Sequence, residues 1–326
     1  MRLQILSAAG LLFALAACDP TLGLGLPSER VLEDGAAKTL SQAKSLGIKG
    51  SFSTSQGVSS TIDLQLVRPT TQHATITTGE EKLEAIVVGE TAYFRGPKFL
   101  AGHMGTDPLS QNLVKAAGNS WWRGSPGNIP SMTEFTDGAA FRTSFLGSAN
   151  TQRTDHQTVD GQGAVELSGA RADLFIAAAP PYHLLRVHLK EGVLIDTMYS
   201  VDFHYNDFDR DFQITAPPDV IDFSNLSTLP PVYTVVSVDT SRCGSPCIVS
   251  AQLKNLGGAT GATGPSTVTF TMAAAISNTV LGSCQSTVAP DVGYNGTTTA
   301  SCTITVGSQP ENAAVVTATA NNPGRG

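Results

Sequence analysis

Short runs of alternating apolar and polar residues fill the segment from Ile48 to Arg95, and Gly and Pro residues separate many of them. An alternation with a period of two is typical of strands that bury one face. The pattern predicts five strands with tight turns between them, at residues 48–54, 61–67, 73–78, 83–88 and 91–95. Successive strands of this kind form an antiparallel meander.

Helical spacing marks the segments on either side of this meander. Ser28 is suited to cap a helix over residues 29–46, and Gly47 would end that helix. Two further helices are predicted in the middle of the chain, at residues 107–117 and 138–146. These helices are the segments available to cover an apolar face of the sheet.

Strand-like alternation resumes after the middle helices, at residues 157–159, 164–167, 172–177, 183–190, 198–205 and 212–215. A meander of about ten strands twists and tends to curl. We therefore predict a curved antiparallel half-barrel sheet capped by helices, with an apolar space between sheet and helices. The alternative, in which side chains fill that space, stays open at this point. A continuous space well above ~300 Å³ would favour a ligand site.

The composition changes near Pro230 and Pro231, beyond which charged residues become sparse and Ser and Thr frequent. We place a domain boundary there, with a half-barrel domain over 30–231 and a second domain over 232–326. Thr- and Val-rich runs in the second domain predict strands at residues 232–238, 248–253, 266–272, 279–282, 297–306 and 313–319. These suffice for a small, all-β, immunoglobulin-like sandwich, so the fold class is α+β followed by all-β.

The N-terminus has the pattern of an export signal. Arg2 precedes an apolar run from Leu3 to Ala17, which is shorter than the ~20 residues that a membrane-spanning helix needs. The run ends in Leu-Ala-Ala-Cys, which resembles the bacterial lipobox, with Cys18 as the lipidated residue. We expect a signal peptide over 1–18, a flexible tether over 19–29, and a protein anchored through diacylglycerol and palmitate at the extracytoplasmic face of the cell membrane. An ordinary signal peptide with an incidental Cys is the alternative.

Four stretches and a Trp pair occur in an order that resembles LppX/LprG-type bacterial lipoproteins, namely residues 86–96, 159–167, 182–187 and 214–218 together with Trp121-Trp122. The resemblance implies a LolA/LolB-like half-barrel with an acyl-chain cavity and a role in binding or shuttling lipids in the cell envelope. In the C-terminal domain, Asn255 to Gly258 and the distant pair Cys284 and Cys302 resemble CARDB-like or other immunoglobulin-like adhesion modules.

Charge and motifs exclude several classes of function. The net charge of −7 offers no basic field for a phosphate backbone, so we expect no nucleic-acid partner. Nucleophile-elbow, zinc-helix and Walker-loop motifs do not occur in the sequence. We therefore expect a protein that is not an enzyme, with no catalytic residues, no cofactor and no metal.

The cysteines that remain after Cys18 are even in number, as expected for disulfides in an exported chain. We favour pairing Cys243 with Cys247 and Cys284 with Cys302. A zinc site is the alternative, because the first two have ligand-like spacing, but the other two are far apart.

The residues expected to line the cavity are apolar or aromatic and occupy alternate strand positions or helix stripes: Phe52, Leu64, Leu66, Ile76, Ile86, Phe94, Leu113, Trp121, Phe141, Phe145, Leu174, Ile176, Leu185 and Val187. The function they predict is non-catalytic binding or shuttling of an acyl-chain lipid or a lipidated molecule. The alternative is an adhesion or scaffold lipoprotein that binds an envelope protein through its C-terminal sandwich, with a filled half-barrel.

Overall fold

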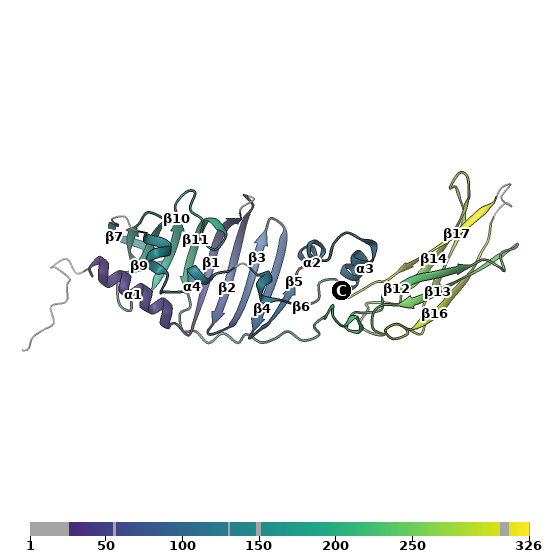
Figure 1. Ribbon diagram of the computed structural model, residues 1–326, viewed down its shortest axis with the longest axis horizontal. Helices are drawn as coiled ribbons and strands as arrows, with labels where there is room; N and C mark the ends of the chain where they lie inside the picture. The colour runs from purple at the N-terminus through teal and green to yellow at the C-terminus, as the bar shows by residue number, and fades with distance from the viewer. Residues whose placement is uncertain (1–25, 55–56, 130, 148–150, 307–312, 326) are drawn as a thin grey trace, which may run out of the picture. The chain divides into compact units, whose positions relative to one another are not determined.

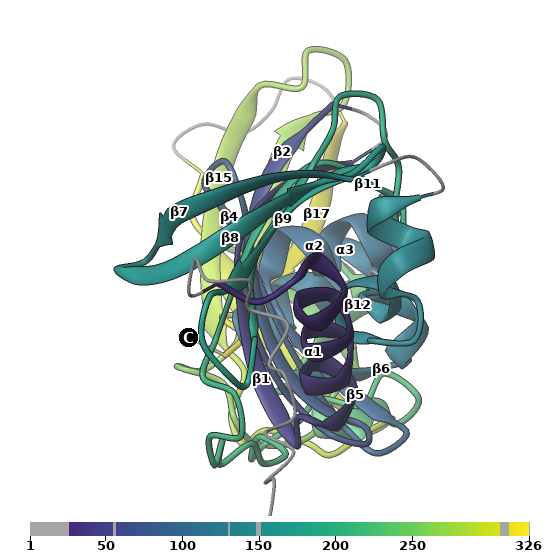
Figure 2. The same cartoon turned by 90° about the vertical axis from the view of Figure 1, so that its left-hand side faces the viewer.

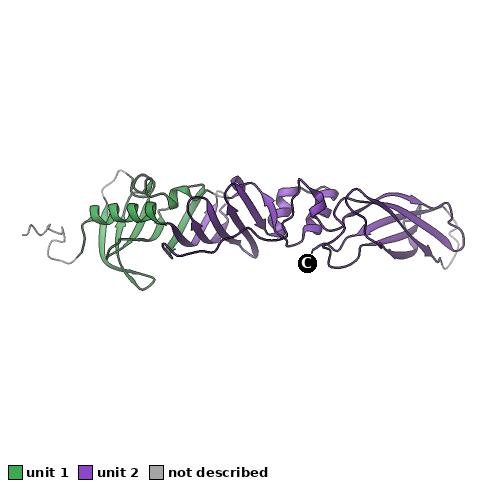
Figure 3. Cartoon of the chain, turned by 90° about the horizontal axis from the view of Figure 1, so that it is seen from below, with its two compact units in different colours: residues 1–43, 131–206 green, residues 44–130, 207–326 purple. Residues whose placement is uncertain are grey.

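The computed structural model describes residues 26–54, 57–129, 131–147, 151–306 and 313–325. The expected signal peptide, Cys18 and most of the tether lie outside these residues. The chain divides into two compact units, unit 1 (residues 1–43 and 131–206) and unit 2 (residues 44–130 and 207–326), coloured separately in Figure 3.

The chain is mostly β, so the predicted α+β class overstates its helical content. Among the described residues, the strands of a large antiparallel sheet number six within unit 2 and five within unit 1. Six more form two three-stranded sheets near the C-terminus (Figure 1). In the part of the chain that the structure describes, no helix is both long enough and apolar enough to cross a bilayer.

Unit 1 contributes five strands in the order β11-β10-β9-β8-β7. Their bounds are β7 (Gln152–Val159), β8 (Gln162–Ser168), β9 (Ala172–Ala177), β10 (Leu184–Leu189) and β11 (Met198–Asn206). Helix α1 (Glu29–Gln42) contacts β9 and β10 through a face that buries Leu32, Ala36 and Leu40 (Figure 2). The short α4 (Thr133–Thr136) and the π-helical turn η2 (Arg142–Leu146) add aromatic side chains to this unit.

Unit 2 contributes six strands in the order β6-β5-β4-β3-β2-β1. Their bounds are β1 (Ser45–Thr54), β2 (Ser59–Val67), β3 (Thr71–Thr78), β4 (Glu81–Val88), β5 (Thr91–Arg95) and β6 (Trp122–Gly124). Between β5 and β6 the chain forms α2 (Pro97–Met104) and α3 (Pro108–Ala117), and Pro126–Asn128 forms a 3-10 turn, η1. Another 3-10 turn, η3 (Leu226–Thr228), lies ahead of the C-terminal strands.

The C-terminal strands of unit 2 form a sandwich of two sheets, β12-β13-β16 and β15-β14-β17. Their bounds are β12 (Tyr233–Asp239), β13 (Cys247–Asn255), β14 (Thr267–Ala274), β15 (Val280–Thr287), β16 (Thr297–Ile304) and β17 (Ala314–Asn321). The two sheets share one core, in which Val249 and Leu253 of β13 pack with Phe270 of β14. The immunoglobulin-like or CARDB-like assignment stays a prediction, as does the domain boundary after residue 231.

The predicted elements differ from the observed ones at several places, and the helix expected at 138–146 is present only as the π-helical turn η2. The first helix ends at Gln42 instead of continuing to 46, because the chain turns into β1 there and the Lys44 N–H donates to Asp209 at 2.7 Å. The strand expected at 212–215 does not form in a segment that leads to Pro217 and Pro218. Helix α2 and strand β6 were not anticipated.

Candidate ligand-binding site

Strand register in unit 2 places a set of apolar side chains on one face of the sheet. Phe52 of β1 lies opposite Ser60 of β2, and Ile62, two residues further along β2, lies opposite Ile76 of β3. Ile76 in turn pairs with Leu83 of β4. Since side chains alternate between faces, Phe52, Ile76 and Leu83 point to the same side.

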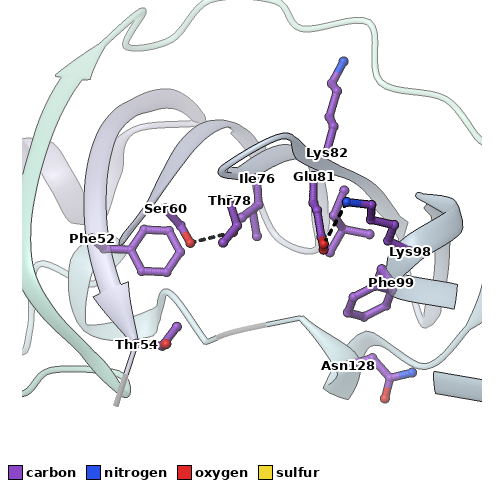
Figure 4. A pocket seen from close by; sticks show the side chains of 11 residues that line it. Phe52, Thr54, Ser60, Ile76, Thr78, Glu81, Lys82, Lys98, Phe99 and Asn128 are labelled. Atoms are coloured by element: carbon purple, nitrogen blue, oxygen red, sulfur yellow. Dashed lines mark hydrogen bonds and ion pairs between the residues drawn. The ribbon is translucent and has the colours of Figure 1, made fainter. Parts of the chain in front are cut away.

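A pocket with a volume of about 270 Å³ opens on this face, entirely within unit 2 (Figure 4). Its lining combines apolar side chains with hydroxyls, one amide and charged residues near the edge: Phe52, Ile76, Leu83 and Phe99; Thr54, Ser60 and Thr78; Asn128; and Glu81, Lys82 and Lys98. Apolar atoms make up most of the exposed lining. A concave, mostly apolar surface with a few polar groups is the usual form of a small-ligand site.

Two pairs of polar groups within the pocket are bonded to each other. The hydroxyls of Ser60 and Thr78 share a hydrogen bond of 2.7 Å, which ties β2 to the end of β3. The Lys98 ammonium lies 3.2 Å from the Glu81 carboxylate and so links α2 to β4. Both partners of this ion pair are exposed, so it contributes little to stability and can open readily. With these groups paired, the apolar surface is the main feature a ligand meets.

Lys82 contributes to the pocket wall, but its ammonium points away from the cavity (Figure 4). It lies 2.6 Å from the Glu84 carboxylate, which also accepts hydrogen bonds from the Arg95 guanidinium. Burial raises the pKa of Glu84, but hydrogen bonds from Lys82 and Arg95 outweigh it and hold that pKa below its usual range. This charged cluster belongs to the opposite face of the sheet.

The structure brings some of the expected lining residues of unit 2 together and separates others. Phe52 and Ile76 line the pocket. Leu64 is buried and Leu66 half-buried on the same face, outside the pocket lining.

Phe94 and Leu113 are buried in an apolar cluster with Trp122. The Phe94 and Trp122 rings lie 4.8 Å apart. These residues support the sheet and helices without reaching the pocket.

Ile86 and Trp121 do not belong with this set. Ile86 pairs with His73 and Tyr93, so it points to the face opposite Leu83. Trp121 precedes the buried Trp122. The Arg95 guanidinium carbon lies over the Trp121 ring, 4.6 Å from the centroid of that ring.

In unit 1 the expected lining residues are buried. Five of them are fully buried, namely Phe141, Phe145, Leu174, Ile176 and Val187. The ring of Phe145 lies 5.9 Å from that of Phe141 and 5.6 Å from that of Phe135, and Phe135 in turn lies 5.0 Å from Phe203 of β11. The Tyr205 hydroxyl, whose pKa burial raises, donates to the Phe135 carbonyl at 2.9 Å. Large buried rings therefore cover this part of the apolar face.

Leu185 is the unit 1 residue that faces the other way. The pairing of β10 with β9 is irregular between Leu184 and Arg186, so Leu185 packs with Val159 and Ala164 on the opposite face. A bulge of this kind changes which face of the sheet a side chain points to, so simple alternation predicts the wrong face.

A second pocket, of about 310 Å³, lies within unit 1 and is polar. Its two carboxylates accept hydrogen bonds from neighbouring residues of unit 1. Asp196 accepts the Glu134 N–H at 2.8 Å, and Glu134 accepts the Ser144 hydroxyl. Desolvation, together with the nearby Glu134 charge, raises the pKa of Asp196. We assign no ligand to this pocket.

Sequence reasoning missed Leu83 and Phe99 as pocket residues. Leu83 could have been predicted from the sequence, because it is the first residue of the predicted strand at 83–88 and the register pairs it with Ile76. Phe99 lies on α2, an eight-residue helix with Gly96 at its N-cap and Pro97 in its first turn. Helix α2 lies between two strands and is too short for its periodicity to stand out.

The cysteines form the favoured pairs, Cys243 with Cys247 and Cys284 with Cys302. The thiols that the zinc alternative required are therefore bonded to each other. Among the described residues, no group of three or more His, Cys, Asp and Glu side chains is placed to hold a metal ion.

No protein-family model matches the chain, and no curated protein matches it. The solved structures that are similar to it at low identity include the following. The crystal structure of MucB in complex with MucA(peri) is 10% identical, covers 86% of this chain and 94% of its own, and has a TM-score of 0.28. The MucA/MucB complex of Pseudomonas aeruginosa is 12% identical, with coverages of 84% and 92% and a TM-score of 0.27.

The third similar structure, a crystal structure of MucB, is 12% identical, with coverages of 84% and 91% and a TM-score of 0.28. Likenesses this distant carry no argument about fold or function. The fold and the site themselves define a mostly-β protein with a large antiparallel sheet, a small sandwich and an apolar pocket on one face of the sheet.

Proposed function

We propose that this chain is a non-catalytic binding protein that holds an acyl-chain segment of a lipid or lipidated molecule in the unit 2 pocket. The observation that carries the proposal is the apolar lining by Phe52, Ile76, Leu83 and Phe99, beside polar groups that are bonded in pairs. An alkyl chain needs no polar partner, since its binding is driven by removal of methylene groups from water.

The size of the pocket limits what it holds. Its volume of about 270 Å³ does not reach the space well above ~300 Å³ that was expected to favour a ligand site, and it lies just under the usual range of ~300–1,000 Å³ for small-molecule sites. The cavity thus suits one alkyl segment and is too small for a lipid with several chains. Six buried methylenes would contribute about 5 kcal/mol before the costs of association, which predicts reversible binding suited to transfer.

Binding is tested by titrating the full chain with decanoic acid and measuring heat release. Ile76→Trp, which fills the pocket, should reduce the affinity at least tenfold. The matched control is Leu66→Trp, on the same face but outside the pocket, which should bind like the wild type. Equal affinities in both variants, or no binding by the wild type, would contradict the proposal.

The lipobox-like sequence at Cys18 supports a second element of the proposed function, a lipid anchor that holds the binding domain outside the cytoplasmic membrane. Cys18→Ala should move the protein from the membrane fraction to the soluble fraction, and labelled palmitate should no longer be incorporated. A mutant that stays in membranes after signal cleavage would remove the anchor from the account while leaving the pocket untouched.

A further inference from the structure

Each of the three sheets ends in two edge strands, whose outer backbone groups are free to pair with another chain unless something prevents it. In the large sheet both edges are protected. Strand β6 has only three residues, and the N–H of its middle residue, Arg123, donates to the Ile221 carbonyl at 2.8 Å. Strand β7 carries Arg153 and Asp155, and its pairing becomes irregular at His156, which has a φ of 59°.

Three of the four edges in the sandwich are protected too. The pairing of β12 is irregular between Val235 and Ser237, and the strand ends in a charged residue, Asp239. Strands β15 and β16 lie next to each other and are joined by the disulfide between Cys284 and Cys302. Bulges, charges and cross-links are the devices by which proteins keep edges from pairing.

Among the described residues, strand β17 carries no charge, bulge or disulfide, although β12 lies beside part of it. Its eight residues carry no charge, no Pro and no Gly. They pair with β14 without interruption, from Thr267 opposite Asn321 to Ala274 opposite Ala314 (Figure 1). Strand β17 is therefore a long, regular and uncharged edge.

One end of β17 is occupied by β12. The Tyr233 N–H donates to the Asn322 side chain at 2.9 Å, and the Asn322 amide donates back to the Tyr233 carbonyl at 3.1 Å. Asn322 directly follows the last residue of β17, so these hydrogen bonds lie at the C-terminal end of the strand. The exposed edge is thus the N-terminal part, around Val315 to Ala318.

Apolar residues are exposed beside this part of the strand. Val315 of β17 and Val280 of β15 both lie opposite Ala273 of β14, and their exposed fractions are 52% and 61%. Ile276, in the turn between β14 and β15, is 82% exposed. Exposed apolar side chains next to an unprotected edge indicate an interaction surface.

We propose that β17 pairs antiparallel with β17 of a second copy of this chain, which joins two three-stranded sheets into one of six strands. A second copy fits because the strand is uncharged, so antiparallel self-pairing places no like charges opposite one another. Its β-branched Val and Thr residues suit a strand. The pairing also has the two-fold symmetry of the commonest dimers.

The test is sedimentation velocity of the full chain over a range of concentrations. The wild type should form a dimer that dissociates on dilution, and V315K and T317K should each weaken association at least tenfold. The matched control is T303K, at an exposed position of the protected strand β16, which should leave association unchanged. A wild type that is monomeric at its solubility limit, or a dimer that neither β17 variant weakens, would overturn the proposal.

A second measurement needs no variant and so does not depend on their folding. Amide hydrogen exchange of residues 314–318 should slow as the wild-type concentration rises, while exchange in β15 should stay constant. Exchange rates in β17 that are independent of concentration would also overturn the proposal.

Discussion

The apolar faces that the two units present on the large sheet differ in how they are covered. In unit 1 the face of β9, β10 and β11 packs against aromatic rings, and Phe135, Phe141, Phe145 and Phe203 are all fully buried. In unit 2 the face that carries Phe52 and Ile76 is covered incompletely, and a pocket remains.

The difference shows that the strand pattern does not decide whether the face of a sheet carries a pocket. Both units bury alternate apolar residues on their strands. What differs is the covering segment, because α4 and η2 bring large rings onto unit 1 whereas Phe99 of α2 stands at the wall of a space. A site of this kind arises where the covering side chains are too few to reach native packing density.

Replacing a Phe by Ala should give the largest difference in the free energy of unfolding between the two units. Phe145→Ala removes a fully buried ring from unit 1 and should lower the free energy of unfolding by about 3–5 kcal/mol. Phe99→Ala, at the half-buried pocket wall, should cost less than half as much. Urea unfolding followed by circular dichroism measures both, and similar losses would show that the pocket wall is packed like the core.

Replacing an aliphatic side chain by the larger Phe should also destabilise unit 1 more than unit 2. Val187→Phe inserts a ring among fully buried residues of unit 1, and overpacking there should cost about 1–3 kcal/mol. Ile76→Phe extends into the unit 2 pocket and should cost less than about 1 kcal/mol, because the added atoms occupy existing space. Thermal unfolding of the two variants checks this, and an equally destabilised Ile76→Phe would contradict an open pocket.

Charged clusters on the other face of each unit should produce the smallest effects. Arg186 donates two hydrogen bonds of 2.6 Å to Asp202, which holds the pKa of Asp202 below its usual range, and His188 and His204 lie 3.9 and 3.8 Å from the same carboxylate. A lowered pKa means that the stabilisation is present above about pH 4 and is lost as the pH falls through the folded-state value.

Asp202→Asn should therefore cost about 1 kcal/mol or less at pH 7, since the pair is partly exposed, and should flatten the acid dependence of stability. Glu84→Gln is the matched variant in unit 2, where Lys82 and Arg95 also lower the pKa of the carboxylate. Unfolding midpoints between pH 3 and pH 7 test both. If both variants show the same pH dependence of the unfolding midpoint as the wild type, these ion pairs do not contribute to stability.

Sequence patterns predicted the elements better than the directions of their side chains. The helical spacing of residues 107–117 gave α3 to within one residue, and the alternation of β3 placed Ile76 on the pocket side. Ala85, Ile86 and Val87 are buried in succession, so alternation could not show which face Ile86 occupies. The bulge before Arg186 reversed Leu185 in the same way. Local spacing does not encode register irregularities or the volume left between sheet and helices.

The most direct test of the central claim is the location of a bound alkyl chain. Crystals of the full chain soaked with 10-bromodecanoic acid should show anomalous bromine density in unit 2, in the pocket formed by Phe52, Ile76, Leu83 and Phe99, and crystals of Ile76→Trp should lose it. Bromine among Phe135, Phe141 and Phe145 of unit 1, or equal density in the wild type and the Ile76→Trp variant, would contradict the account.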